Sequence, residues 1–247
     1  MAKKYLRKNR PGDIDVGCVI HSNGYDFEYV LKLERNLRDN FTCPINFHVW
    51  TEAHREGVPT RMIRHDLQDL GVAGPRRSWW YKMQLFNNKT FKGTLYYFDL
   101  DVIIWGNLDW MLNLDPKRFW AIRDFRYLWR KHKWQFNSSI MKVNTGAYHH
   151  LWKKFLDSKD HWMRQYHGDQ DFLNKEVEPN DKDYLPTDKI KSYRWEVCKG
   201  GMDFTTRAYP NAGKPRDHIL NPCSVIVFHG KPNPHEIKDD PEILKKW

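Results

Sequence analysis

Two aspartates one residue apart, Asp99 and Asp101, follow a run of strand-forming residues and could together hold a metal ion. The run Thr-Leu-Tyr-Tyr-Phe predicts a strand over 94–101 that continues into the apolar segment 102–105. Because side chains alternate along a strand, both carboxylates are expected on one side, with Leu100 facing the core. Paired carboxylates repel each other unless a cation lies between them, and Mn²⁺ or Mg²⁺ binds such oxygens while sharing ligands with substrate phosphates. The pattern therefore predicts a divalent-cation site at a strand end.

Five further residues could complete such a site. His229 ends an apolar run and is followed by a glycine and Lys231, which together offer an imidazole for Mn²⁺ and an ammonium for phosphate. Asp169 and Gln170 begin a predicted helix, and Lys82 lies near the start of another. Each position also has an ordinary structural interpretation, such as a helix cap for Asp169 or a solvated charge for Lys82.

Apolar runs and helical patterns alternate along the chain, which predicts an α/β fold. Besides the aspartate strand, strands are predicted over 15–20, 45–50, 62–63, 119–122, 140–143 and 224–228. Helices are predicted over 27–37, after Pro75, over 148–156 and over 169–177. The Pro- and Gly-rich stretches 179–186 and 209–215 are predicted to be surface loops. This order indicates one domain over 13–247 after a basic, flexible N-terminal segment 1–12.

The composition favours anionic partners without pointing to nucleic acid. The 247 residues include 41 Lys+Arg against 31 Asp+Glu, a net charge of +10. Apart from a basic cluster near the N-terminus, charges of both signs are interspersed and no long basic helix is predicted, so nucleic acid is an unlikely partner. No stretch of ~20 apolar residues is visible, so no membrane span is predicted. The sequence also shows no secretory signal and no C-x-x-C pair. We expect a cytoplasmic protein, in the host cytoplasm if it is viral.

Five segments, in the same order, resemble the glycogenin-like, family-eight glycosyltransferases and their bacterial and phage relatives. The segments are SWWYKMQLF, LYYFDLDVIIWGNLDWM, FNSSIMKVNTG, GDQDFLN and SVIVFHGKPNPHE. With the first predicted strand they extend over about 15–235. The resemblance implies a GT-A (nucleotide-diphospho-sugar transferase) fold, with a Rossmann-like mixed central sheet flanked by helices. It implies hexosyl-type transfer from a nucleotide-diphosphate sugar, with a UDP-sugar as the expected donor, Mn²⁺ or Mg²⁺ as cofactor and retention of the anomeric configuration.

The resemblance also implies roles for the matching residues. Asp99 and Asp101 would ligate the metal with His229, which lies two residues after the position of the family's histidine. The catalytic residues would be Asp101, Asp169 and Gln170. The donor would be bound by His21, Ser22, Asn23, Tyr25, Lys82, Asp99, Asn137 and Lys231.

Two other functions are compatible with the sequence. A nucleotidyltransferase would also use a metal on carboxylates, but it would require a glycine-rich phosphate loop where this chain has only Asn23 and Gly24. A non-catalytic carbohydrate- or nucleic-acid-binding protein would suit the 12 Trp and 12 Tyr, but it would not need Asp99 and Asp101 together with His229. The acceptor, whether glycan, protein or small molecule, is identified by no motif, and its contacts are expected in the segments 124–135 and 179–215.

Overall fold

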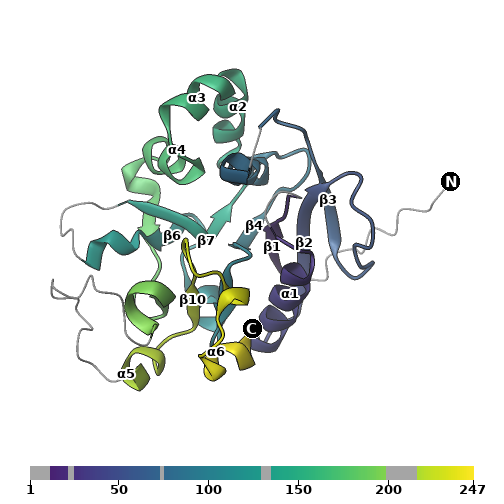
Figure 1. Cartoon of the computed structure of the whole chain (residues 1–247). Helices are drawn as coiled ribbons and strands as arrows, with labels where there is room; N and C mark the ends of the chain where they lie inside the picture. Colours follow the sequence, from purple (N-terminus) through teal and green to yellow (C-terminus); the bar gives the residue numbers. More distant parts are fainter. Residues whose placement is uncertain (1–11, 22–24, 73–74, 129–134, 199–215) are drawn as a thin grey trace.

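The computed structural model describes residues 12–21, 25–72, 75–128, 135–198 and 216–247. These residues form a larger and a smaller β-sheet with helices packed around them (Figure 1). The α/β architecture predicted from the sequence is confirmed. No helix of the described ranges combines the length and the apolar character needed to span a bilayer.

The larger sheet has seven strands in the order β3-β2-β1-β4-β7-β6-β8. Their bounds are β1 Ile14–Val19, β2 Ile45–Glu52, β3 Ile63–Leu67, β4 Thr94–Phe98, β6 Phe119–Arg123, β7 Phe136–Asn144 and β8 Lys182–Tyr184. The four strands from β3 to β4 are parallel to one another, whereas β7 runs antiparallel to both β4 and β6. All eight residues of β2 are buried, as expected for a strand with parallel neighbours on both sides and helices over its faces.

One face of this sheet is covered by α1 (Glu28–Asn40). Its apolar residues recur at helical spacing, so Val30, Leu33 and Leu37 point to the sheet and are 0%, 2% and 0% exposed. They pack against Val16 and Cys18 of β1 in the same apolar cluster. The strand–helix–strand connection from β1 to β2 therefore places the chain segment before α1 at the carboxyl end of β1.

The opposite face is covered by a 3₁₀ helix (Pro75–Phe86), α2 (His149–Asp157) and α4 (Asp169–Glu176), with α3 (Lys159–Gln165) between the last two. Aromatic rings join these elements, since Trp80 stacks on Phe155 at 5.3 Å and Phe155 meets Phe172 edge-on at 6.0 Å. This apolar contact holds the start of α4 against the sheet and the 3₁₀ helix.

The smaller sheet has the order β5-β10-β9, with bounds Val102–Ile104, Val225–Val227 and Ile190–Ser192. The short helices α5 (Arg216–Leu220) and α6 (Pro241–Lys246) lie beside it, and Figure 1 shows the C-terminus ending next to α1. There the indole of Trp247 meets the ring of Tyr29 edge-on at 4.5 Å. Short 3₁₀ or π turns occupy Asp109–Asn113, Phe125–Leu128, Pro179–Asp181, Tyr193–Val197 and Pro234–Glu236.

Two predictions are corrected by the fold. The single strand predicted over 94–105 is two strands, β4 and β5, which belong to different sheets. The loop predicted over 179–186 contains β8, which pairs in parallel with β6 at the edge of the larger sheet. β8 has only three residues, too few to show the alternation that predicts a strand. The loop predicted over 209–215 lies outside the described residues.

Candidate active site

Three neighbouring strands meet at one edge of the larger sheet. β1 and β4 run parallel and end at Val19 and Phe98, whereas β7 runs the other way and begins there. Phe98 pairs with Ile140, and the Asp99 amide extends the ladder by donating to the Ser139 carbonyl over 2.7 Å. Since ligands of open α/β sheets bind beyond the carboxyl ends of the strands, this edge is the expected place for a site.

Asp99, Leu100 and Asp101 form the turn between β4 and β5, not the strand that the sequence predicted. Leu100 is 4% exposed and anchors the turn in the core. The amide of Phe228, next to β10, donates to the Asp101 carbonyl over 2.9 Å. The turn is therefore the point at which the chain leaves the larger sheet for the smaller one, and both carboxylates line a single pocket.

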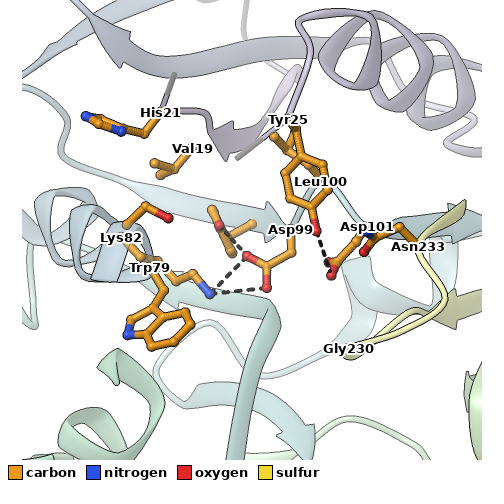
Figure 2. A pocket seen from close by; sticks show the side chains of 12 residues that line it. Val19, His21, Tyr25, Trp79, Lys82, Asp99, Leu100, Asp101, Gly230 and Asn233 are labelled. Carbon is orange, nitrogen blue, oxygen red and sulfur yellow. Dashed lines mark hydrogen bonds and ion pairs between the residues drawn. The ribbon is translucent and has the colours of Figure 1, made fainter. Parts of the chain in front are cut away.

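The ammonium of Lys82 lies beside Asp99 within this pocket (Figure 2). Its Nζ is 2.9 Å from Asp99 Oδ1 and 3.5 Å from Asp169 Oδ2. Lys82 also donates to Ser138 Oγ over 3.0 Å, and that hydroxyl donates to Asp169 Oδ2 over 2.6 Å. The Tyr97 hydroxyl donates to Asp99 Oδ1 over 2.6 Å. Lys82 and Asp169 are 5% and 3% exposed, so their attraction is little screened by water.

The site holds more negative charge than its buried lysine balances. Burial raises the pKa of Asp101 to about 7, and the nearby Asp99 carboxylate adds to the rise. Burial also raises the pKa of Asp169, although Lys82 and the Ser138 hydroxyl oppose it. Burial acts to lower the pKa of Lys82, but Asp169 and Asp99 outweigh it and hold that pKa above its ordinary value. When all three carboxylates are ionised, they and the one ammonium carry two net negative charges, which a divalent cation would balance.

The carboxylates open into a pocket of about 430 Å³, here called the donor pocket. His21 lies away from Asp101 in Figure 2, and its imidazole stacks on the Tyr81 ring at 4.2 Å. The Tyr25 hydroxyl donates to Asp101 Oδ2 over 3.2 Å. The other lining residues are Val19, Ser78, Trp79, Lys82, Tyr97, Asp99, Leu100, Gly230 and Asn233. The pocket thus combines aromatic rings with charged side chains, which suits a ligand with a planar base and a diphosphate.

A second pocket of about 750 Å³ lies beside the donor pocket, since His229 lines it and the next residue, Gly230, lines the donor pocket. Asn137 and Gln170 line the second pocket, whereas their chain neighbours Ser138 and Asp169 contact Lys82 of the donor pocket. The Asn137 Oδ1 accepts a hydrogen bond from the Ser139 amide over 3.0 Å, which fixes the side chain. The start of β7 and the start of α4 therefore line the second pocket and contact Lys82 of the donor pocket.

Two residues expected near the metal or the phosphates contact other side chains in this structure. His229 lines the second pocket, and its Nε2 lies 2.6 Å from the Ser192 hydroxyl. Burial lowers the pKa of His229 to about 4, so the imidazole is neutral. The Lys231 side chain is 73% exposed and forms an ion pair with Glu236. Across the described ranges, no three His, Cys, Asp or Glu side chains are grouped so as to hold a metal.

Ser22 and Asn23, predicted to bind the donor, lie outside the described residues. Two residues of the site were not predicted to act there. Ser138 joins Lys82 to Asp169, and its position next to Asn137 in a strand was the only available signal. Trp79 lines the donor pocket and packs against Gly168, where an added Cβ would lie 2.9 Å from the indole Nε1.

Comparisons with known proteins find no matching family model and no curated protein that matches in sequence. Among solved structures, an active-site variant of LgtC matches with a TM-score of 0.65 and 14% identity, over 94% of this chain and 93% of that chain. The galactosyltransferase LgtC in complex with donor and acceptor sugar analogues matches with a TM-score of 0.62 and 15% identity, over 89% of this chain and 88% of that chain. The glycosyltransferase GlyE of Streptococcus pneumoniae matches with a TM-score of 0.65 and 12% identity, over 92% of this chain and 58% of that chain. At these identities the likeness establishes the fold, which is the mixed α/β GT-A fold of these glycosyltransferases.

Proposed function

We propose that this chain, built on the GT-A glycosyltransferase fold, is a metal-dependent glycosyltransferase that moves a hexosyl group from a nucleotide-diphosphate sugar to an acceptor. The observation that carries the proposal is the position of Asp99 and Asp101 beside buried Lys82 in one pocket at the carboxyl edge of the sheet. A UDP-sugar is the proposed donor. The structures of similar fold, named as a galactosyltransferase and a glycosyltransferase, support the reaction class.

The residues of the donor pocket fit a divalent cation such as Mn²⁺ or Mg²⁺. Asp99 and Asp101 would hold it, because they supply the hard oxygen ligands that such ions prefer and leave an excess of negative charge without one. His229 is the third proposed ligand, since its imidazole is neutral, but its hydrogen bond with Ser192 would have to open. When bound, such an ion supplies Lewis-acid neutralisation of the leaving diphosphate.

The remaining side chains would bind and orient the donor. The stacked rings of His21 and Tyr81 suit the nucleobase, and Tyr25 would contact the donor beside Asp101. Asn137, Asp169 and Gln170 are proposed to bind the sugar, with Ser22, Asn23 and Lys231 as further donor contacts. Lys82, which is itself buried, would place a positive charge beside the diphosphate.

In the proposed reaction, the bond between the anomeric carbon and the diphosphate oxygen breaks as the acceptor oxygen bonds to that carbon. The proton of the acceptor hydroxyl passes to the departing phosphate oxygen, so the atoms and charges balance. Gln170 offers only an amide, which is a poor nucleophile. We therefore favour attack on the face from which the diphosphate leaves, which retains the anomeric configuration.

The proposal is tested by thermal unfolding with UDP-glucose or UDP-galactose, each with Mn²⁺ or with EDTA. A ligand at about 100 times its dissociation constant stabilises the folded state by about 2.7 kcal/mol, which raises the Tm by about 5 °C. We expect this shift only with Mn²⁺, and we expect Asp101→Asn to lose it. Asp39→Asn, at an exposed carboxylate on α1, is the matched control and should keep it. Equal shifts in EDTA, or an undiminished shift in Asp101→Asn, would exclude the metal-bound donor.

A further inference from the structure

The second pocket lies next to the place where the transferred sugar would be held. Asp169 reaches Lys82 over 3.5 Å in the donor pocket, while Gln170, the next residue of α4, lines the second pocket. A sugar bound by Asp169 would therefore be within reach of a nucleophile bound beyond Gln170. Part of the second pocket is thus available for an acceptor.

Five of the twelve residues that line this pocket carry side-chain amides. Gln165, at the end of α3, and Gln170 make no side-chain hydrogen bond within the part of the chain that is described. Asn174 uses its Oδ1 to accept the Phe136 amide over 3.2 Å, which leaves its NH₂ group for a ligand. An amide can donate and accept, and so can a sugar hydroxyl, whereas an ionised phosphate only accepts.

The charges that line the second pocket balance one another. Asp124 and Arg126 form a two-pronged ion pair, with distances of 2.8 Å and 3.0 Å, so this guanidinium is already occupied. Asp171 and Lys175, one turn apart on α4, supply one further charge of each sign. A pocket for phosphate or sulfate would need cations without acidic partners. Among the described residues that line the second pocket, two acidic and two basic side chains therefore leave no excess of positive charge.

Two rings complete the lining. Tyr166, which caps α3, and His167, whose ring lies 5.3 Å from that of Trp79, both line the second pocket. Flat apolar faces with polar edges suit the C–H face of a sugar ring.

We propose that the second pocket is the acceptor site and that the acceptor is a neutral carbohydrate. This inference rests on the proposed glycosyltransferase function and adds the chemical class of the acceptor. The acceptor hydroxyl, held by the amides of Gln165 and Asn174, is the nucleophile that replaces the diphosphate oxygen at the anomeric carbon.

The test is an array that carries neutral glycans, sialylated and sulfated glycans, and single-stranded DNA, probed with the full chain in UDP and Mn²⁺. We expect neutral glycans to bind in preference to every anionic probe. Gln165→Leu should weaken that binding about tenfold, because one hydrogen-bonding side chain is lost. Gln68→Leu is the matched control, since Gln68 is exposed and outside both pockets, and it should bind as the unmodified chain does.

Thermal shifts with UDP-sugar and Mn²⁺ separate this inference from the function on which it rests. Gln165→Leu should keep the full donor shift and the same unfolding midpoint without ligand. Three results would each overturn the inference and leave the function standing. They are a preference for sulfated glycans or DNA, an absence of glycan binding in a chain that binds the donor, and neutral-glycan binding that Gln165→Leu does not weaken. Loss of the donor shift in the unmodified chain would instead refute the proposed function.

Discussion

Replacing Lys82 by methionine tests whether this ammonium holds the acidic residues of the donor pocket together. Lys82→Met keeps the length of the side chain but removes the charge that contacts Asp99 at 2.9 Å and Asp169 at 3.5 Å. Asp169 is 3% exposed, so without Lys82 the Ser138 hydroxyl is the one side-chain partner that it keeps among the described residues. Removing one partner of a buried ion pair costs about 3–5 kcal/mol. We expect a loss of about 3 kcal/mol in the free energy of unfolding at pH 8.

The same variant has a pH signature. Burial already raises the pKa of Asp169, and Lys82 is the main group that lowers it again. Without Lys82 the folded-state pKa rises further, so the penalty is full at high pH and shrinks as the pH falls and the carboxylate takes up a proton. The deficit of Lys82→Met should therefore be smaller at pH 5 than at pH 8.

Urea unfolding in EDTA at pH 5 and pH 8 measures both effects. Lys32→Met is the control, because Lys32 pairs with Glu28 over 3.2 Å at the surface of α1, where such a pair contributes less than about 0.5 kcal/mol. A loss in Lys82→Met no larger than in Lys32→Met, or a loss that does not change with pH, would refute the electrostatic account of the site.

Three further outcomes are expected. Burial lowers the pKa of His65 from 6.5 to about 3. The imidazole therefore binds a proton more weakly in the folded chain than in the unfolded chain, and the folded state loses stability as the pH falls below 6.5. By pH 5 the loss is about 2 kcal/mol, and His65→Phe should remove that part of the slope in urea unfolding between pH 7 and pH 5. In Gly168→Ala the new Cβ would lie 2.9 Å from Trp79 Nε1, so the indole should move. We expect a shift in tryptophan fluorescence and weaker donor binding in a titration. An unchanged spectrum and affinity would contradict this contact. Tyr25→Phe removes the 3.2 Å hydrogen bond to the Asp101 carboxylate and should cost about 1–2 kcal/mol in urea unfolding at pH 8, and an unchanged midpoint would show that the bond contributes nothing.

Local patterns in the sequence were enough to predict the α/β fold and to select the aspartate pair. Strand and helix periodicity depends on neighbouring residues, which is why β1, β2 and α1 were predicted close to their observed bounds. The selection of Asp99 and Asp101 is also local, because an apolar run followed by two carboxylates is visible without knowledge of the fold.

Tertiary structure decided what these residues touch. Ser138 meets Lys82 from 56 positions away and Asp169 from 31 positions away, because β7 runs antiparallel beside β4 and α4 packs on β7. No local pattern encodes such a contact, since it depends on which strands become neighbours. Side chains alternate in direction only within a regular strand. Asp99 lies in a turn and His229 lies beyond the end of β10, so distant partners set the direction of both side chains, as the hydrogen bond of His229 with Ser192 shows.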